Sequence, residues 1–229
     1  MNKHRENEIE YIESIIKNNT DLTGWVCDDE DDDGVTDWYH INADHTYPSI
    51  KVIKINDTLC AFNEAGRALD CFVSCGRYKE EGDLEDKWIL NTYFEDESKL
   101  TPETFLSFDD SYYFFLGRDG LARDKVIDIK FSDGNTYQYV VDSNGHKYSQ
   151  EFIGDKLCVN GLIANKNMFL TPYKKFGTIM RNGIPYLCDP EGRVLNTNKF
   201  KYKDGRVYAY INTDRTFFYS TKANDPKWY

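Results

Sequence analysis

A short turn pattern returns along the sequence at a nearly constant step, and it constrains the fold more than any other feature. The pattern is an apolar residue, then Asp, Asn or Gly, then two free positions and Gly. Complete copies stand at residues 62–66, 116–120, 141–145 and 188–192, and degenerate copies without the closing Gly stand at 164–168 and 211–215. From residue 120 onward the closing positions are 120, 145, 168, 192 and 215, so the step is 23 to 25 residues. Such a step is typical of a chain built from repeated supersecondary units.

Each repeated unit is predicted to be a β-hairpin. An Asp or Asn side chain hydrogen-bonds its own backbone in a turn, and the closing Gly supplies a positive φ. The flanking segments are rich in Tyr, Phe, Val and Leu, which favour strands. A single hairpin is only marginally stable in water, so the units must stack. We therefore predict a mainly β fold of antiparallel, stacked β-hairpin repeats, in the form of a propeller, a solenoid or a curled sheet.

The N-terminal segment follows a different period. Ile9, Ile12, Ile15 and Ile16 recur at helical spacing, with glutamates between them. This spacing predicts a short amphipathic helix that ends near residue 18.

The charge of the chain is divided unevenly. Residues 1–110 hold 27 acidic and 10 basic side chains, whereas the rest holds 12 acidic and 18 basic ones. We expect an N-terminal helix within 1–20, an acidic β-rich half over 21–110 and a regular hairpin-repeat half over 111–229, with 21–229 forming one continuous domain. The formal net charge of −11 argues against a generic nucleic-acid binder.

The sequence also bears on the compartment. No stretch approaches the roughly 20 apolar residues of a membrane span, and residues 1–10 are polar and charged, unlike a signal peptide. We expect a soluble, cytoplasmic protein with no membrane partner, whose six cysteines are reduced and buried. The oligomeric state stays open.

Residues 112–120 and 186–194 resemble the core hairpin of WG-type repeats and of the aromatic β-hairpin repeats that bind cell-wall polymers. The resemblance covers about residues 110–220, and the Trp-Gly pair that names the first family is absent. It implies a binding or scaffold module, and it brings no catalytic residues with it.

An acidic segment has the spacing of a calcium loop, D-x-D-x-D-G-x-x-D. Its candidate ligands are Asp29, Asp31, Asp33 and Asp37. Ca²⁺ takes six to eight oxygen ligands, and Gly34 permits the sharp turn that such a loop needs. The segment resembles the calcium loops of FG-GAP type propellers and of thrombospondin-like repeats. It departs from an EF-hand, because His40 stands where a bidentate Glu is required. The alternative interpretation is a solvated acidic loop or a partner-docking patch.

The same loop is the candidate partner-binding surface, together with the acidic residues of 80–97. The residues expected to bind the partner are Asp28, Asp29, Glu30, Asp31, Asp32, Asp33 and Asp37. Carboxylates clustered in this way attract a basic protein surface. The sequence thus favours a non-enzymatic cytosolic interaction protein that binds and inhibits a basic protein partner, as an inhibitor, immunity or anti-defence protein would.

Residues suited to catalysis are scarce. The chain has four histidines, and neither of the common Gly-rich phosphate-binding motifs occurs. A cluster of His40, Asp44 and His45 with Cys60 is the one candidate nucleophilic site. We expect no enzyme and no cofactor other than the candidate Ca²⁺. Two alternatives remain, namely a Ca²⁺-stabilised β-repeat module that binds carbohydrate or another ligand, and an enzyme on an unrecognised β scaffold.

Overall fold

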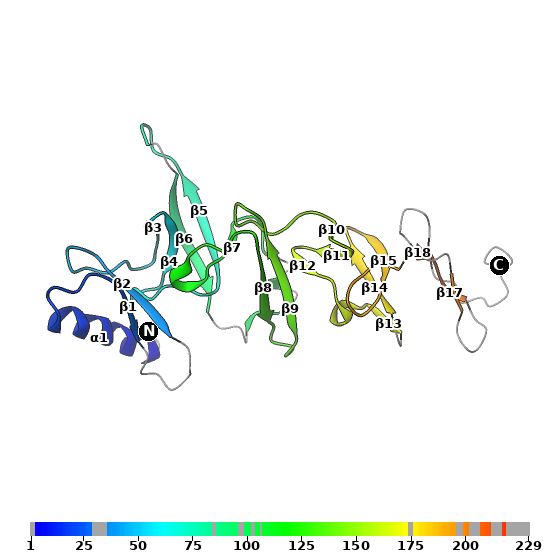
Figure 1. The fold of residues 1–229 in the computed structure, drawn as a ribbon, viewed down its shortest axis with the longest axis horizontal. Coiled ribbons are helices and arrows are strands. Elements are labelled where there is room, and N and C mark those ends of the chain that lie inside the picture. Colours follow the sequence, from blue (N-terminus) through cyan, green and yellow to red (C-terminus); the bar gives the residue numbers. More distant parts are fainter. Residues whose placement is uncertain are drawn as a thin grey trace. The chain divides into compact units, whose positions relative to one another are not determined.

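A computed structural model describes residues 3–28, 36–83, 86–95, 99–101, 104–105, 107–173, 176–195, 199–201, 207–211 and 217–218. Antiparallel strands follow a single long helix within these residues (Figure 1). The predicted mainly β fold is therefore confirmed. The chain divides into two compact units, the first comprising Met1–Lys125 and Val141–His146 and the second Val126–Val140 and Lys147–Tyr229. The predicted division into an acidic and a regular half stays a prediction.

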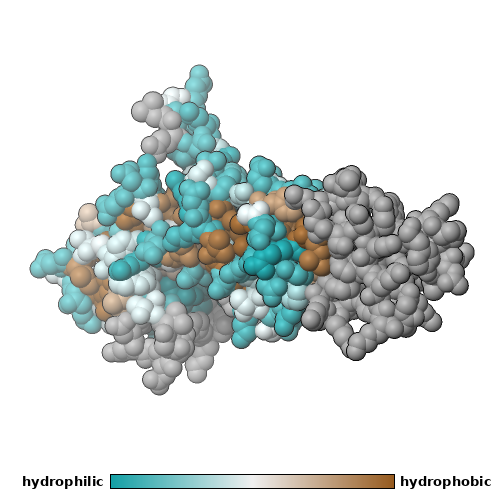
Figure 2. Space-filling view, turned by 45° about the vertical axis from the view of Figure 1, so that its right-hand side comes forward, coloured by the Kyte–Doolittle hydropathy of each residue, from teal (hydrophilic) through white to brown (hydrophobic). Residues whose placement is uncertain are grey.

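The first unit begins with the helix and continues in short sheets. Its elements are α1 (Lys3–Asn18), β1 (Gly24–Asp28), β2 (Asp37–Ile41), β3 (Lys51–Ile55), β4 (Thr58–Phe62), β5 (Phe72–Tyr78), β6 (Lys87–Phe94), β7 (Tyr112–Phe114) and the 3-10 turn η2 (Gly117–Asp119). β1 pairs with β2, β3 pairs with β4, and β5 lies between β6 and β7. The outer ends of β5 and β6 stand out from the rest of this unit (Figure 1). The described residues there are hydrophilic on the face that Figure 2 shows.

The second unit holds the later hairpins. Its elements are β8 (Lys125–Lys130), β9 (Thr136–Val141), β10 (Phe152–Ile153), β11 (Lys156–Val159), β12 (Leu162–Ile163), the 3-10 turn η3 (Lys166–Met168), β13 (Thr171–Tyr173), β14 (Phe176–Arg181), β15 (Ile184–Cys188), β16 (Lys199–Lys201), β17 (Val207–Ile211) and β18 (Phe217–Phe218). One of its cores joins Leu157 and Val159 of β11 to Ile179 of β14 and Tyr186 of β15. Successive hairpins of this unit thus share apolar surface, as the repeat requires.

Helix α1 confirms the predicted amphipathic segment. Ile12 is fully buried, and it packs with Tyr39 and Ile41 of β2 and with Ala65. The apolar stripe of the helix thus covers the β1–β2 hairpin. No helix among the described residues is both long and apolar enough to cross a membrane.

The turn pattern forms the hydrogen bonds that its residue types predict. At Asn63, Asp142 and Asp189 the side-chain Oδ1 accepts from the backbone N–H groups two and four residues later, at 2.9 or 3.0 Å. In the copy at 116–120, Gly117 replaces the Asx residue, and the turn closes by backbone bonds alone. The degenerate copy at 164–168 forms η3, in which Asn165 Oδ1 accepts from Asn167 N–H at 2.9 Å. The copy at 211–215 lies mostly outside the described residues.

The pattern does not mark the tips of the longer hairpins. In three of its copies the turn connects two residues that form an isolated β-bridge at the end of a strand, as between Phe62 and Ala68 or between Cys188 and Val194. The tips of three hairpins instead use two consecutive residues of positive φ, at 56–57, 160–161 and 182–183. Turns of this kind match the twist of paired strands. Each repeat is therefore a hairpin followed by an Asx turn.

The closing glycines also allow close packing between repeats. A Cβ on Gly120 would lie 2.5 Å from the backbone oxygen of Leu59, and one on Gly192 would lie 1.9 Å from that of Ala164. Next to the first contact, Leu121 N–H donates to Leu59 O at 2.8 Å. These two turns thus dock on the backbone of an earlier segment, which explains why Gly stands at their closing position.

Candidate functional site

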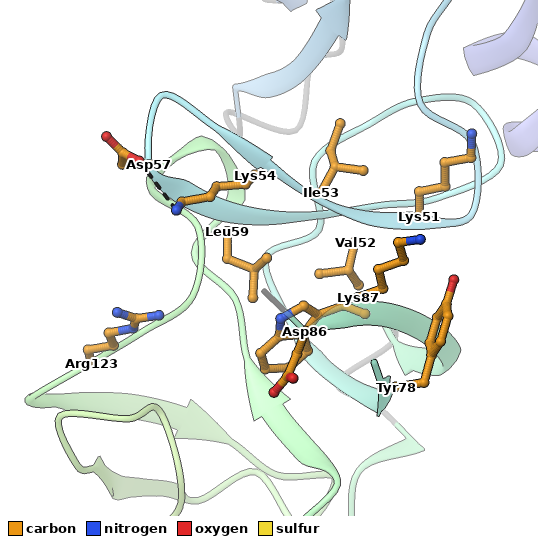
Figure 3. Close-up of a pocket in the computed structure, with 11 residues that line it drawn as sticks. Lys51, Val52, Ile53, Lys54, Asp57, Leu59, Tyr78, Asp86, Lys87 and Arg123 are labelled. Carbon is orange, nitrogen blue, oxygen red and sulfur yellow. Dashed lines mark ion pairs between the residues drawn. The ribbon is translucent and has the colours of Figure 1, made fainter. Parts of the chain in front are cut away.

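A groove in the first unit is a candidate site, because charged and aromatic side chains of the described residues line it together. It lies between β3, the beginning of β6 and the chain after β7, and its volume is about 460 Å³. Its lining residues are Lys51, Val52, Ile53, Lys54, Asp57, Leu59, Tyr78, Asp86, Lys87, Trp88 and Arg123. In Figure 3, Val52 and Leu59 occupy the middle of the groove, Lys54 and Arg123 lie on one side, and Lys51, Lys87 and Tyr78 lie on the other.

Two of the four cations of the groove are already paired. Lys54 Nζ lies 3.3 Å from Asp57 Oδ1. Lys87 Nζ lies 2.8 Å from Glu80 Oε2 and 3.1 Å from Asp83 Oδ2. These hydrogen bonds to Glu80 and Asp83 raise the pKa of Lys87, so it stays charged at neutral pH.

The other two cations face the groove without an acidic partner. Lys51 and Arg123 are exposed, and within the described part of the chain neither forms an ion pair. One lining carboxylate, that of Asp86, is likewise exposed and unpaired among these residues. The groove therefore offers two cationic groups and one carboxylate to a ligand.

An aromatic ring in the groove is held in place by its neighbours. The Arg77 guanidinium lies 4.2 Å from the centre of the Trp88 ring and 5.1 Å from that of Tyr113. Trp88 and Tyr113 also meet edge to face at 5.1 Å. Trp88 is half-buried and lines the groove, so it offers a fixed apolar surface without reorganisation.

A second charged cluster lies beneath α1 and serves the fold. Arg67 Nη1 lies 2.9 Å from Asp37 Oδ1, its Nη2 lies 2.6 Å from Glu95 Oε1, and its Nε lies 2.8 Å from Glu8 Oε1. Burial lowers the pKa of Arg67, but the charges of Glu95, Asp37 and Glu8 outweigh it and raise the pKa. Arg5 of α1 pairs with Glu8 and Glu95 in the same cluster. The cluster ties the helix to β2 and to Glu95, the residue after β6.

Glu64 extends this cluster toward solvent. Burial raises the pKa of its carboxyl group, but the hydrogen bond from Tyr93 and the charge of Arg5 outweigh burial, and the net pKa is lowered. A lowered pKa in the folded state means that Glu64 stabilises the fold above its ordinary pKa. That contribution is lost as the pH falls through the lowered value.

The predicted acidic loop connects β1 to β2. Asp28 and Asp37 form the last pair of the β1–β2 register. Residues 29–35, which include Asp29, Glu30, Asp31, Asp32 and Asp33, lie outside the described residues, as does the side chain of Asp28. The structure thus brings Asp37 to Arg67 and leaves the calcium and partner predictions for this loop as predictions.

The candidate nucleophilic cluster lacks an activated thiol. Cys60 is buried in an apolar cluster with Phe62 and Ala68, and burial raises the pKa of its thiol to about 11. Burial also lowers the pKa of His40, which packs edge to face against Trp25 at 5.2 Å. A thiol with this pKa is protonated at neutral pH, whereas a nucleophilic cysteine needs the thiolate.

The remaining cysteines bear on the predicted thiol state and on metal binding. All six are free thiols, and Cys27 is exposed whereas the other five are buried. The predicted burial is therefore confirmed at every position except Cys27, and the reduced state of the thiols stays a prediction. The described residues contain no group of three His, Cys, Asp or Glu side chains that could hold a metal ion.

Sequence reasoning missed the groove and the Arg67 cluster. The groove joins Lys51, Trp88 and Arg123 from segments far apart in the chain. No spacing rule links such residues, although the lysines of 51–54 in an acidic region were a signal. Arg67 carried a clearer signal, because it directly follows a turn glycine and is the only basic residue between Lys54 and Arg77.

Comparisons with known proteins leave the family open. No protein-family model matches the sequence, and no curated protein matches it. Three solved structures that resemble the chain come from Streptococcus pneumoniae. They are the modular autolysin LytC (14% identity over 86% of this chain and 39% of that one, TM-score 0.25), CbpJ (13% identity, 86% and 80%, TM-score 0.24) and choline binding protein F (14% identity, 86% and 80%, TM-score 0.22). At these TM-scores the chains do not superimpose as wholes, and we take no ligand or activity from them.

Proposed function

We propose that this chain is a non-enzymatic binding protein and that its ligand occupies the groove between β3, β6 and Arg123. One observation carries the proposal, namely that Lys51 and Arg123 flank an apolar surface with Trp88 and have no acidic partner among the described residues. In a chain of net charge −11, cations that no carboxylate of the described residues neutralises are suited to an external ligand. The volume of about 460 Å³ lies within the usual range of small-molecule sites.

The proposal is tested by binding measurements on the full chain. Three probes are titrated into ¹⁵N-labelled protein, namely a nucleoside monophosphate, maltotriose and a short acidic peptide. A groove ligand shifts the amide signals of residues 51–59 and the indole N–H signal of Trp88, which a Trp88→Phe spectrum assigns. If no probe moves these signals, or if probes move only signals elsewhere, the groove is not the ligand site.

A second candidate function uses the acidic loop instead. It is favoured by the register of β1 and β2, whose last pair, Asp28 with Asp37, puts the acidic run at the connection of a hairpin. Under this proposal the loop binds and inhibits a basic protein partner, as inhibitor or immunity proteins do, because its carboxylates complement a positive surface.

The second candidate is tested with a triple variant of the loop. Asp31, Asp32 and Asp33 are changed to Asn, and binding to immobilised basic proteins is measured at low salt. The acidic-loop function is supported if the triple variant loses binding at low salt and if high salt also abolishes binding of the original chain. Unaltered binding of the triple variant contradicts it.

A further inference from the structure

The groove also points to the chemical class of its ligand. Resting on the function proposed for this groove, we infer that the ligand is a small anion with a flat ring and an N–H donor, such as a nucleoside monophosphate. The anionic group meets Arg123, the ring contacts Trp88, and the donor meets Asp86, while Lys51 on the other side of the groove adds to the positive potential. A neutral sugar would leave the two cations without a partner.

The anionic end follows from the charges that remain after internal pairing. Lys54 is paired with Asp57, and Lys87 is paired with Glu80 and Asp83, so these cations are already compensated. Lys51 and Arg123 keep their charge for a ligand, and an arginine fork suits phosphate and carboxylate oxygens. Among the described residues, the unpaired charges at the groove are therefore two positive and one negative.

The ring follows from the apolar part of the groove. Val52 and Leu59 lie between the two cationic sides, and Figure 3 shows both in the middle of the groove. Arg77 covers the Trp88 ring and Tyr113 meets it edge to face, so a ligand ring that packs on the exposed part of Trp88 does not have to immobilise it on binding. Stacking of a ring on an aromatic side chain is a general mode of base recognition.

The donor follows from Asp86. Its carboxylate is exposed on the groove and repels an anion that approaches it. A ligand that puts an N–H group there and its anion elsewhere turns this repulsion into a hydrogen bond. The groove therefore discriminates against a plain polyanion, which would place negative charge on all its parts.

The test separates charge from ring. Full-length protein is titrated by calorimetry with AMP, with adenosine and with inorganic phosphate at low salt. The charge variant is Lys51→Gln with Arg123→Gln, and the matched control is Lys125→Gln, an exposed lysine outside the groove lining. The melting temperatures of the variants report whether the fold is intact.

We expect AMP to bind at least 10-fold more tightly than adenosine or phosphate. The charge variant should remove that advantage and the control should keep it, since a charged hydrogen bond contributes about tenfold in affinity. The binding of AMP should also weaken as salt is added. This pattern supports the inference.

Other outcomes overturn the inference and separate it from the proposed function. If AMP and adenosine bind equally and both shift the Trp88 indole signal, the anion is wrong while the groove remains the site. Groove binding by maltotriose, with none by AMP, leads to the same conclusion. Groove binding by the acidic peptide, with none by AMP, would mean that the flat ring is wrong while the groove remains the site. If none of the probes binds at the groove, both the inferred ligand and the proposed function fail.

Discussion

Replacing Arg67 with Met should destabilise the first unit more than any other single ion-pair change among the described residues. The variant removes the cation that lies 2.6 to 2.9 Å from Glu95, Glu8 and Asp37. The side chains of Glu8 and Arg67 are only 5% and 18% exposed, so water cannot compensate the carboxylates that remain. Breaking a buried pair from one side costs roughly 3–5 kcal/mol. For a chain of this size the cost corresponds to a fall in melting temperature of about 10 °C.

Arg193 supplies a matched control for this prediction. It also contacts three carboxylates, those of Asp155, Asp189 and Glu191, but its side chain is 47% exposed. Exposed ion pairs contribute about 0–1 kcal/mol, so Arg193→Met should leave the melting temperature within about 3 °C of the original. Urea unfolding followed by circular dichroism gives both free energies. If the two variants lost equal free energies of unfolding, the argument that burial makes the Arg67 ion pairs more stabilising than those of Arg193 would be refuted.

Three further predictions concern a turn, a thiol and the acidic loop. Gly120→Ala should cost at least about 2 kcal/mol in urea unfolding, because Gly120 has φ 73° and ψ −151° and a Cβ there would lie 2.5 Å from Leu59 O. Gly134→Ala, with φ 79° and no atom within 4 Å, should cost clearly less, and an equal cost would contradict the packing argument. Iodoacetamide at neutral pH should alkylate Cys27 first, because it is exposed whereas burial raises the pKa of the Cys60 thiol to about 11; mass spectrometry showing early modification of Cys60 would contradict this. The melting temperature in millimolar Ca²⁺ should lie within about 1 °C of the value in EDTA, because Asp37 already pairs with Arg67. A rise of several degrees with Ca²⁺ and not with Mg²⁺ would establish the calcium loop instead.

Local chemistry in the sequence predicted the elements of the fold. The isoleucine spacing located α1, and the Asx and Gly positions located turns whose hydrogen bonds repeat at Asn63, Asp142 and Asp189. These features depend on neighbours a few residues apart, which a single sequence displays. The hairpin tips at 160–161 and 182–183 carry Asn-Gly pairs that also signal a turn, although these pairs lie outside the five-residue pattern.

The candidate site could not be predicted in the same way. The acidic run is visible in the sequence because its residues are consecutive. The groove residues Lys51, Trp88 and Arg123, in contrast, line one groove only when β3, β6 and the chain after β7 come together. Whether a cation is available to a ligand also depends on its partners within the fold. Lys54 and Lys87 look equivalent to Lys51 in the sequence, but the fold pairs them with carboxylates and leaves Lys51 without one among the described residues.

The most direct test of the central claim is a map of ligand-induced shifts in the ¹⁵N spectrum of the full chain on titration with AMP. We predict saturable shifts at residues 51–59, at the Trp88 indole and at Arg123, and their loss in the Lys51→Gln, Arg123→Gln double variant. Shifts confined to other residues, or shifts that the double variant retains, would contradict the assignment of this groove as the binding site.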